Sequence, residues 1–223
     1  MLKAKKNNTL MWGFTRYNRQ FIRRNFENIY IRCESNQRLN KKKLFIANHS
    51  SWWDSLVIYF LNDQVIQSDA YGMMHKEGME RFPFFRGIGV YSVDSKDRNH
   101  LLESLRYSCD LLNNNKTVWI FPQGEEQHLE KRPLHFSNGI SYIIQNSKEI
   151  EVVPVSIYYS FGHTKKPDIY INVGFPVETT KLIPLQRKEI TRYLEKVSTE
   201  QLDSLKDCVI QERNDLFINF GRS

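Results

Sequence analysis

A histidine and an aspartate five positions apart are the residues in this chain best suited to chemistry. His49 and Asp54 both lie in residues 48–54, whose sequence is NHSSWWD. The apolar run before them, residues 43–47, predicts a buried strand, and residues 55–61 predict a buried helix. Because an α-helix has about 3.6 residues a turn, positions five apart lie roughly 140° apart on it. The two side chains therefore meet only if His49 lies in the loop and Asp54 in the first helical turn.

Such a pair is suited to general-base catalysis. A carboxylate that holds an imidazole fixes its tautomer and stabilises its protonated form, as a general base requires. The junction of a strand with a helix is also a usual location for chemistry in open α/β sheets. A simpler interpretation is that Ser51 and Asp54 form the capping box of the helix and that His49 is a surface residue. The sequence leaves both interpretations open.

The composition indicates one globular domain with a basic surface. A chain of 223 residues that is 40% apolar can bury a sizeable core. Its net charge of +7 favours a polyanionic partner, such as anionic lipid, nucleic acid or a phosphorylated carrier. Cys33, Cys109 and Cys208 are odd in number and widely spaced. This argues against a disulfide framework or a zinc site and favours a reducing compartment.

No segment predicts a membrane span or a resident metal. Every apolar run is shorter than the roughly 18 residues of a spanning helix. The basic N-terminus lacks the continuous apolar core and the cleavage site of a signal peptide. The remaining histidines show no spacing typical of metal ligands, so we expect them to be structural or surface residues: His75, His100, His128, His135 and His163.

The first 35 residues predict an amphipathic, basic helix that precedes an α/β domain at 36–223. From 11 to 32, apolar side chains recur at steps of three and four, which predicts one helical face: Met11, Phe14, Tyr17, Phe21, Ile22, Phe26 and Ile29. Arginines lie largely on the opposite face: Arg16, Arg19, Arg23 and Arg24. Aromatic and basic residues on one helix are typical of a membrane-surface helix. Alternatively, the helix packs on the domain and its arginines are simply solvated.

The rest of the chain alternates between strands and helices. Strands are predicted at 69–74, 90–94, 117–121, 152–159 and 169–173, and Pro154 suggests that its strand is an edge or contains a bulge. Helices are predicted at 98–112 and 137–145, with one or two more at 185–212. This alternation predicts an α/β fold, a single domain with a mixed central β-sheet flanked by helices.

Four blocks of sequence occur in an order that matches a known enzyme family. They are residues 48–54 (NHSSWWD), 87–94 (GIGVYSVD), 121–124 (FPQG) and 152–155 (VVPV). Across residues 40–180 the chain thus resembles the glycerolipid (lysophosphatidate) acyltransferase superfamily, whose first block is Asn-His-x4-Asp. One block alone is a weak match, whereas four blocks in the same order are a strong one.

The resemblance implies an O-acyltransferase of lipid metabolism, for example in phospholipid biosynthesis. A fatty acyl group would move from acyl-CoA or acyl-carrier protein to a hydroxyl of a lysophospholipid or other glycerolipid-type acceptor. His49 would be the general base and Asp54 its partner. The expected substrate-binding residues are Asn48, Phe121, Pro122, Gln123, Gly124, Glu125 and Arg98. We expect no cofactor besides the thioester co-substrate, no metal, and a peripheral location at the cytoplasmic face of an anionic membrane.

Two blocks depart from the family pattern at positions understood to bind the acceptor's phosphate. The arginine that usually follows the second block is Ser95 here, with Lys96 and Arg98 only nearby. The third block usually reads Phe-Pro-Glu-Gly-Thr-Arg, but Gln123 replaces its glutamate and Glu126 its arginine. Since arginine geometry suits phosphate, an acceptor with a neutral head is an alternative. A glycosylated lipid, such as a carotenoid glycoside, would fit.

Three further interpretations remain. The chain could be a non-catalytic, acyltransferase-like module that binds membrane lipid, which the altered third block favours and the intact His49 and Asp54 oppose. It could be a thioester hydrolase, which only an assay with and without acceptor would distinguish. The charge alone also permits a nucleic-acid binder, but the sequence contains no nucleic-acid-binding motif.

Overall fold

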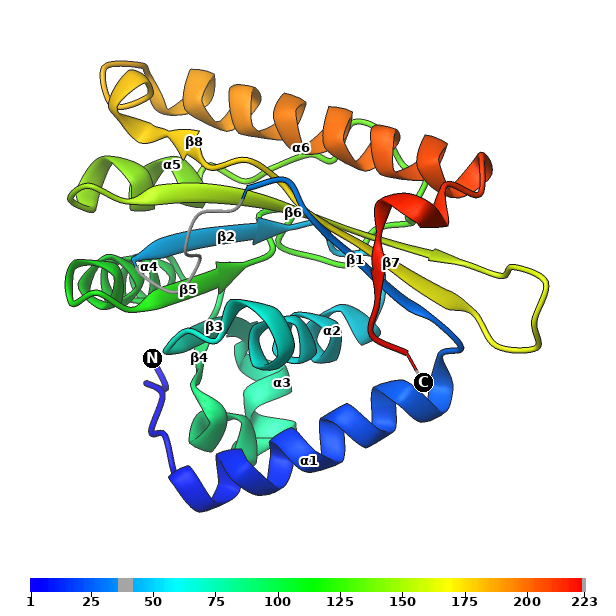
Figure 1. Cartoon of the computed structure of the whole chain (residues 1–223). Coiled ribbons are helices and arrows are strands. Elements are labelled where there is room, and N and C mark those ends of the chain that lie inside the picture. The colour runs from blue at the N-terminus through cyan, green and yellow to red at the C-terminus, as the bar shows by residue number, and fades with distance from the viewer. Residues whose placement is uncertain (36–41, 222–223) are drawn as a thin grey trace.

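One mixed β-sheet runs through the centre of the computed structural model, which describes residues 1–35 and 42–221 (Figure 1). Within these residues the strands are β1 Ile29–Cys33, β2 Lys43–Ala47, β3 Ala70–His75, β4 Val90–Val93, β5 Thr117–Ile120, β6 Glu151–Ser160, β7 Asp168–Val173, β8 Val177–Glu178 and β9 Ile218–Asn219. Their order is β4-β3-β5-β2-β6-β7-β1-β9, and β8 pairs with β6. The predicted fold class, a single α/β domain with a mixed sheet flanked by helices, is confirmed.

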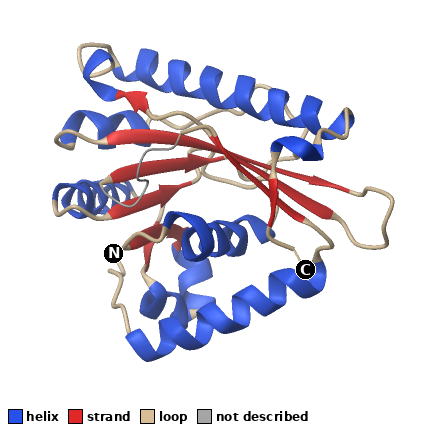
Figure 2. Ribbon diagram, viewed as in Figure 1, coloured by secondary structure: helices blue, strands red, loops and turns tan. Residues whose placement is uncertain are grey.

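Helices cover both faces of this sheet (Figure 2). They are α1 Asn8–Asn25, α2 Trp53–Leu61 with its π-helical continuation η1 Asn62–Ile66, α3 Lys76–Arg81, the 3-10 helix η2 Pro83–Ile88, α4 Arg98–Asn113, α5 Gly139–Asn146, the 3-10 helix η3 Thr179–Lys181, α6 Arg187–Ile210 and the 3-10 helix η4 Asn214–Leu216. On one face α2 lies between the sheet and α1, and on the other lie α4, α5 and α6 (Figure 1).

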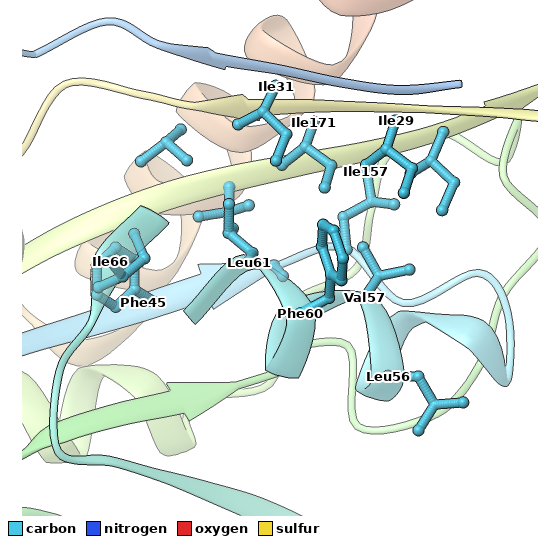
Figure 3. Packing of buried hydrophobic residues seen from close by; sticks show 14 of the residues in the cluster. Ile29, Ile31, Phe45, Leu56, Val57, Phe60, Leu61, Ile66, Ile157 and Ile171 are labelled. Carbon is cyan, nitrogen blue, oxygen red and sulfur yellow. The ribbon is translucent and has the colours of Figure 1, made fainter. Parts of the chain in front are cut away.

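The central strand β2 explains why residues 43–47 read as a continuous apolar run. All five of its residues are buried, because parallel strands lie on both sides of it, β5 and β6. Phe45 and Ala47 belong to the core beneath α2, whereas Leu44 and Ile46 belong to the core beneath α4 and α5. Figure 3 shows the first of these cores, where Phe60 of α2 points toward Ile157 of β6.

The parallel pairing of β2 with its neighbours determines where the functional blocks lie. Parallel strands present their carboxyl ends at the same edge of a sheet. The loops that follow β2 and β5 therefore lie side by side, as do the NHSSWWD and FPQG blocks that they carry. The C-terminal half of β6 reaches the same edge.

The N-terminal helix is shorter than its periodicity predicted. Helical structure was expected to Arg32, but α1 ends at Asn25 and residues 29–33 form β1, which pairs in parallel with β7. Ile29 and Ile31 are buried while Tyr30 and Arg32 are half-buried, which is the two-residue period of a strand. Ile29 fits both periods, so the helical pattern extended too far. Strand β1 places residues from before position 35 in the same sheet as the rest of the chain.

The prediction that Pro154 marks an edge or a bulge was wrong. Strand β6 is an interior strand that pairs with β2 on one side and with β7 on the other. The carbonyl of Pro154 accepts a hydrogen bond from Gly174 N at 2.9 Å, so its backbone polar atoms face the β7 side. There the β7 pairing begins only at Val155. The proline is tolerated because its missing N–H falls just beyond the end of the β7 ladder.

Candidate active site

His49 and Asp54 meet in the way that their spacing required. His49 lies in the loop after β2, and Asp54 is the second residue of α2. The imidazole Nδ1 and the carboxylate Oδ2 are 2.9 Å apart. The His49 side chain is largely buried and that of Asp54 is fully buried. The other ring nitrogen, Nε2, is thereby left for an incoming group.

Asp54 also holds the turn before its helix, but the predicted capping box is incomplete. The Ser51 hydroxyl accepts from Trp53 N at 3.3 Å and not from Asp54 N. His49 is largely buried and is not a surface residue. The Asp54 Oδ2 accepts hydrogen bonds from the backbone N–H groups of Ser50 at 2.6 Å and Ser51 at 2.8 Å.

The other carboxylate oxygen, Asp54 Oδ1, accepts from the hydroxyl of Tyr159 at 2.6 Å. Burial and the adjacent Asp54 charge raise the pKa of the Tyr159 hydroxyl well above its ordinary value. This tyrosine therefore remains a hydrogen-bond donor across the physiological pH range.

The loop of the FPQG block holds His49 from the opposite side. The side-chain oxygen of Gln123 accepts from His49 N at 2.6 Å, and Gln127 N donates to His49 O at 2.9 Å. The His49 ring stacks on Phe121, with centroids 4.1 Å apart and planes inclined by 12°. Both the backbone and the ring of His49 are thus fixed before any substrate binds.

Asn48 fixes the start of the same loop to the neighbouring strand. Its side-chain amide donates to Ile157 O at 2.9 Å, and its side-chain oxygen accepts from Ile157 N at 2.8 Å. Both contacts are buried, and only a carboxamide supplies a donor and an acceptor side by side. Asn48 therefore positions the loop that carries His49.

A cavity of about 510 Å³ opens beside His49. Its walls are mainly apolar and include Leu56, Phe85, Leu105, Ile140 and Ile143. Polar side chains occur at His75, Ser95, Glu126, Ser137 and Asn138. A second cavity of about 380 Å³ beneath α1 shares Ser55, Leu56, Met73, Met74, Phe85 and Phe121 with the first. This size and this apolar lining suit a long hydrocarbon chain with a polar reacting end.

The residues predicted to bind substrate divide into three groups. Phe121, Pro122 and Gly124 line the first cavity together with His49. Asn48 and Gln123 are buried and contact the backbone described above, while Glu125 and Arg98 are exposed and lie outside the described lining. The structure thus brings together the histidine, the aspartate and part of the FPQG block, and leaves Arg98 apart.

Sequence reasoning missed two residues of the site. Tyr159 lies 105 positions after Asp54, and no local pattern links the two. His75 was expected to be an ordinary structural or surface residue, yet it lines the cavity and its Nε2 lies 2.6 Å from Gly124 O. Its position at the carboxyl end of β3, at the same edge of the sheet, is the signal that would have identified it.

Helix α1 presents part of its length outward. Its predicted apolar face packs on the domain at Phe14, Phe21, Ile22 and Phe26, whereas Trp12 and Tyr17 are exposed, by 68% and 55%. None of the described helices is both long enough and apolar enough to cross a bilayer. In the same described residues no three histidine, cysteine, aspartate or glutamate side chains gather in a group that could hold a metal ion.

Comparisons with known proteins found a matching family model and a solved structure of similar fold. The sequence model of a family described as Acyltransferase matches residues 23–158, more than half of the chain. Among solved structures, the fold is similar to that of the 1-acyl-sn-glycerophosphate (LPA) acyltransferase PlsC from Thermotoga maritima. The TM-score is 0.65 at 16% sequence identity, over 88% of this chain and 79% of that one. Comparison with curated protein sequences gave no match.

Proposed function

The chain belongs to the acyltransferase family, and from this premise we propose that it transfers a fatty acyl group from a thioester to a hydroxyl of a lipid acceptor. Family membership makes the protein an acyltransferase and confirms the resemblance to the glycerolipid acyltransferase superfamily. The donor we propose is acyl-CoA or acyl-carrier protein, with no further cofactor. The acceptor is a lysophospholipid or another lipid with a free hydroxyl. The observation that carries the proposal is the His49–Asp54 pair at the mouth of an apolar cavity.

In this mechanism His49 acts as the general base. Its Nε2 takes the proton of the acceptor hydroxyl while the oxygen attacks the thioester carbonyl carbon. The negative Asp54, 2.9 Å from Nδ1, stabilises the imidazolium that forms. When the carbon–sulfur bond breaks, the leaving thiolate takes the proton back from Nε2. The products are an ester and a free thiol, and His49 returns to its starting state.

Direct attack by the acceptor is favoured over an acyl-enzyme. The nearest hydroxyl in sequence, Ser50 Oγ, is buried without a hydrogen-bond partner, so no base activates it. His49 is held by Asp54 and stacked on Phe121, an arrangement that leaves only Nε2 available for proton transfer. The apolar walls of the cavity would hold the acyl chain and exclude water from the thioester.

The protein would work at the surface of an anionic membrane, on its cytoplasmic face. Trp52 and Phe82 line the cavity and are also exposed, so two aromatic side chains lie where it meets the surface. Trp12 and Tyr17 project from α1, with Arg16 exposed between them in sequence. Exposed tryptophan and tyrosine beside arginine are typical of proteins at the membrane interface. Lipid substrates would then enter the cavity from the bilayer.

The test is transfer of labelled acyl groups by wild-type protein, His49→Ala and His163→Ala. A general base supplies about 10²- to 10⁴-fold in rate, so His49→Ala should lose that factor without losing its fold. His163 is exposed and distant in sequence, so its variant is a matched control. Release of free acid without acceptor would instead indicate a thioester hydrolase. No turnover by the wild type with any donor or acceptor would indicate a lipid-binding module.

A further inference from the structure

A carboxylate stands opposite the reactive nitrogen of His49. Glu126 lines the same cavity, and its Oε1 lies 3.8 Å from His49 Nε2. We propose that Glu126 binds the acceptor, and that the acceptor is a neutral head with two adjacent hydroxyls, such as a glycerol or sugar group. This inference rests on the proposed function, because it assigns one of the two hydroxyls to the acylation step.

The separation of the two atoms suits a vicinal diol. At 3.8 Å they are too far apart to bond each other well, and each keeps its hydrogen-bonding capacity for a ligand. The oxygens of a vicinal diol lie about as far apart as two hydrogen-bonded oxygens, about 2.8 Å. One hydroxyl can therefore donate to Nε2 while its neighbour donates to Glu126. The first is then oriented for attack, and its proton passes to Nε2.

Glu126 is held near this position by its neighbours in the chain. Gly124 O contacts His75 Nε2 at 2.6 Å, and Gln127 N donates to His49 O at 2.9 Å. In sequence, Glu126 thus lies between Gly124 and Gln127, whose backbones are hydrogen-bonded to His75 and His49 of the site. Its side chain is half-exposed, so it can meet a polar head at the mouth of the cavity.

The charges around the cavity oppose a phosphate in the same place. None of the described residues that line the cavity is a lysine or an arginine, and Glu126 contributes a negative charge. The nearby Lys96 is exposed and lies 3.9 Å from Glu77 on the outer surface. A phosphate adjacent to the acylated hydroxyl would meet like charge without a lining cation. A neutral diol uses the same carboxylate as an acceptor of hydrogen bonds.

Three ether lipids with the same hydrocarbon chain test the inference. Dodecylglycerol has two adjacent hydroxyls, the dodecyloxypropanol 1-dodecyloxypropan-2-ol keeps the middle hydroxyl but lacks the terminal one, and dodecylglycerol phosphate has its terminal hydroxyl phosphorylated. Initial rates with labelled acyl-CoA give kcat/KM for each. We expect the wild-type kcat/KM for dodecylglycerol to exceed that for either of the other two lipids by about 10- to 100-fold. This factor corresponds to the contribution of one hydrogen bond to a charged group. Preference for the phosphorylated lipid would overturn the inference.

Variants then assign the preference to Glu126. Glu126→Ala should reduce the ratio of kcat/KM for dodecylglycerol over dodecyloxypropanol by about 10- to 100-fold. Glu80→Ala, which removes an exposed glutamate outside the described lining, should leave that ratio at its wild-type value. An unchanged ratio in Glu126→Ala would refute this inference alone, provided that His49→Ala abolishes transfer. Transfer that survives in His49→Ala would refute the proposed function as well.

Discussion

Replacing Asp54 by asparagine separates the charge of this residue from its shape. In the native site three N–H groups point at Oδ2, those of His49 Nδ1, Ser50 and Ser51. An asparagine must therefore place its carbonyl oxygen at that position, because an NH₂ group there would face two backbone donors. The imidazole keeps the tautomer with its proton on Nδ1. Only the negative charge that stabilises the imidazolium is lost.

The size of the expected loss follows from this geometry. A hydrogen bond to a charged group contributes about 1.5–3 kcal/mol, and a neutral one about 0.5–1.5 kcal/mol. The difference of about 1–2 kcal/mol corresponds to a roughly 5- to 30-fold decrease in kcat, at about 1.4 kcal/mol for each factor of ten. If the tautomer were lost instead, the decrease would approach about 10⁴-fold, as it does in a serine-protease triad.

Stability should also fall, for a separate reason. The amide NH₂ would occupy the place of Oδ1, where the buried Tyr159 hydroxyl now donates at 2.6 Å. That hydroxyl would have to turn away and lose its acceptor, which costs about 1–3 kcal/mol in a buried position. Thermal unfolding of Asp54→Asn and of wild type measures this loss apart from kcat.

Single-turnover transfer at saturating donor and acceptor gives the rate of the chemical step. A decrease of about 10⁴-fold in a protein that still unfolds cooperatively would show that the amide is turned the other way, and would refute the orientation deduced here. Full activity with lowered stability would show that Asp54 is only a helix cap. The single-turnover rate of His49→Ala gives the rate expected when the base is removed completely.

Three other changes test neighbouring parts of the structure. Tyr159→Phe removes a donor to the buried Asp54 and should lower kcat about tenfold with KM unchanged, since it affects orientation only; a change confined to KM would contradict this role. Burial opposes ionisation of Asp69, but hydrogen bonds from two lysines lower its pKa overall, so its contribution is present at neutral pH and is lost as pH falls below about 4. The difference in free energy of unfolding between wild type and Asp69→Asn should decline over that range, and a difference independent of pH would exclude the ion pairs as its source. Arg16→Glu with Arg24→Glu, both exposed on α1, should weaken sedimentation with anionic vesicles more than tenfold, at about 1 kcal/mol for each basic residue; binding insensitive to both the variant and salt would argue against a membrane-facing helix.

The sequence was sufficient to predict the fold class and the condition under which His49 and Asp54 meet. Both depended on local signals, namely two apolar runs and the position of a polar block between them. The helices and most strands followed from the same periodicities, as α4 at Arg98–Asn113 and β5 at Thr117–Ile120 show. Helix α6 is a single helix, which resolves the choice between one and two.

Contacts between distant segments were beyond such reasoning. Tyr159 reaches Asp54 only because β6 lies directly beside β2, a pairing that no local pattern encodes. Ile29 fits both a helical and a strand period, and its pairing with Ile169 of β7 determines which one applies. Pro154 was misassigned because an interior strand accepts a proline where the pairing with its neighbour ends, and that point cannot be seen in the sequence.

Arg19 and Arg23 show that a local pattern also fails to predict which surface charges are accessible. On a helical projection they join Arg16 and Arg24 as one basic face. In the structure Arg19 pairs with Asp63 at 2.9 Å and Arg23 is half-buried, so both are less accessible to a lipid head than Arg16 and Arg24. The charge available to a membrane is therefore smaller than the sequence suggested.

One oxygen of Asp54 holds both the loop before α2 and the ring of His49. The same oxygen accepts from His49 Nδ1 and from the amides of Ser50 and Ser51, which lie in the turn just before α2. Those amides belong to the loop that carries His49, so the backbone of this loop fixes the carboxylate that meets the imidazole. Gln123 and Phe121 then hold the other side of His49 from a neighbouring loop. The orientation of the base is thus a consequence of backbone structure, and substrate binding needs to supply none of it.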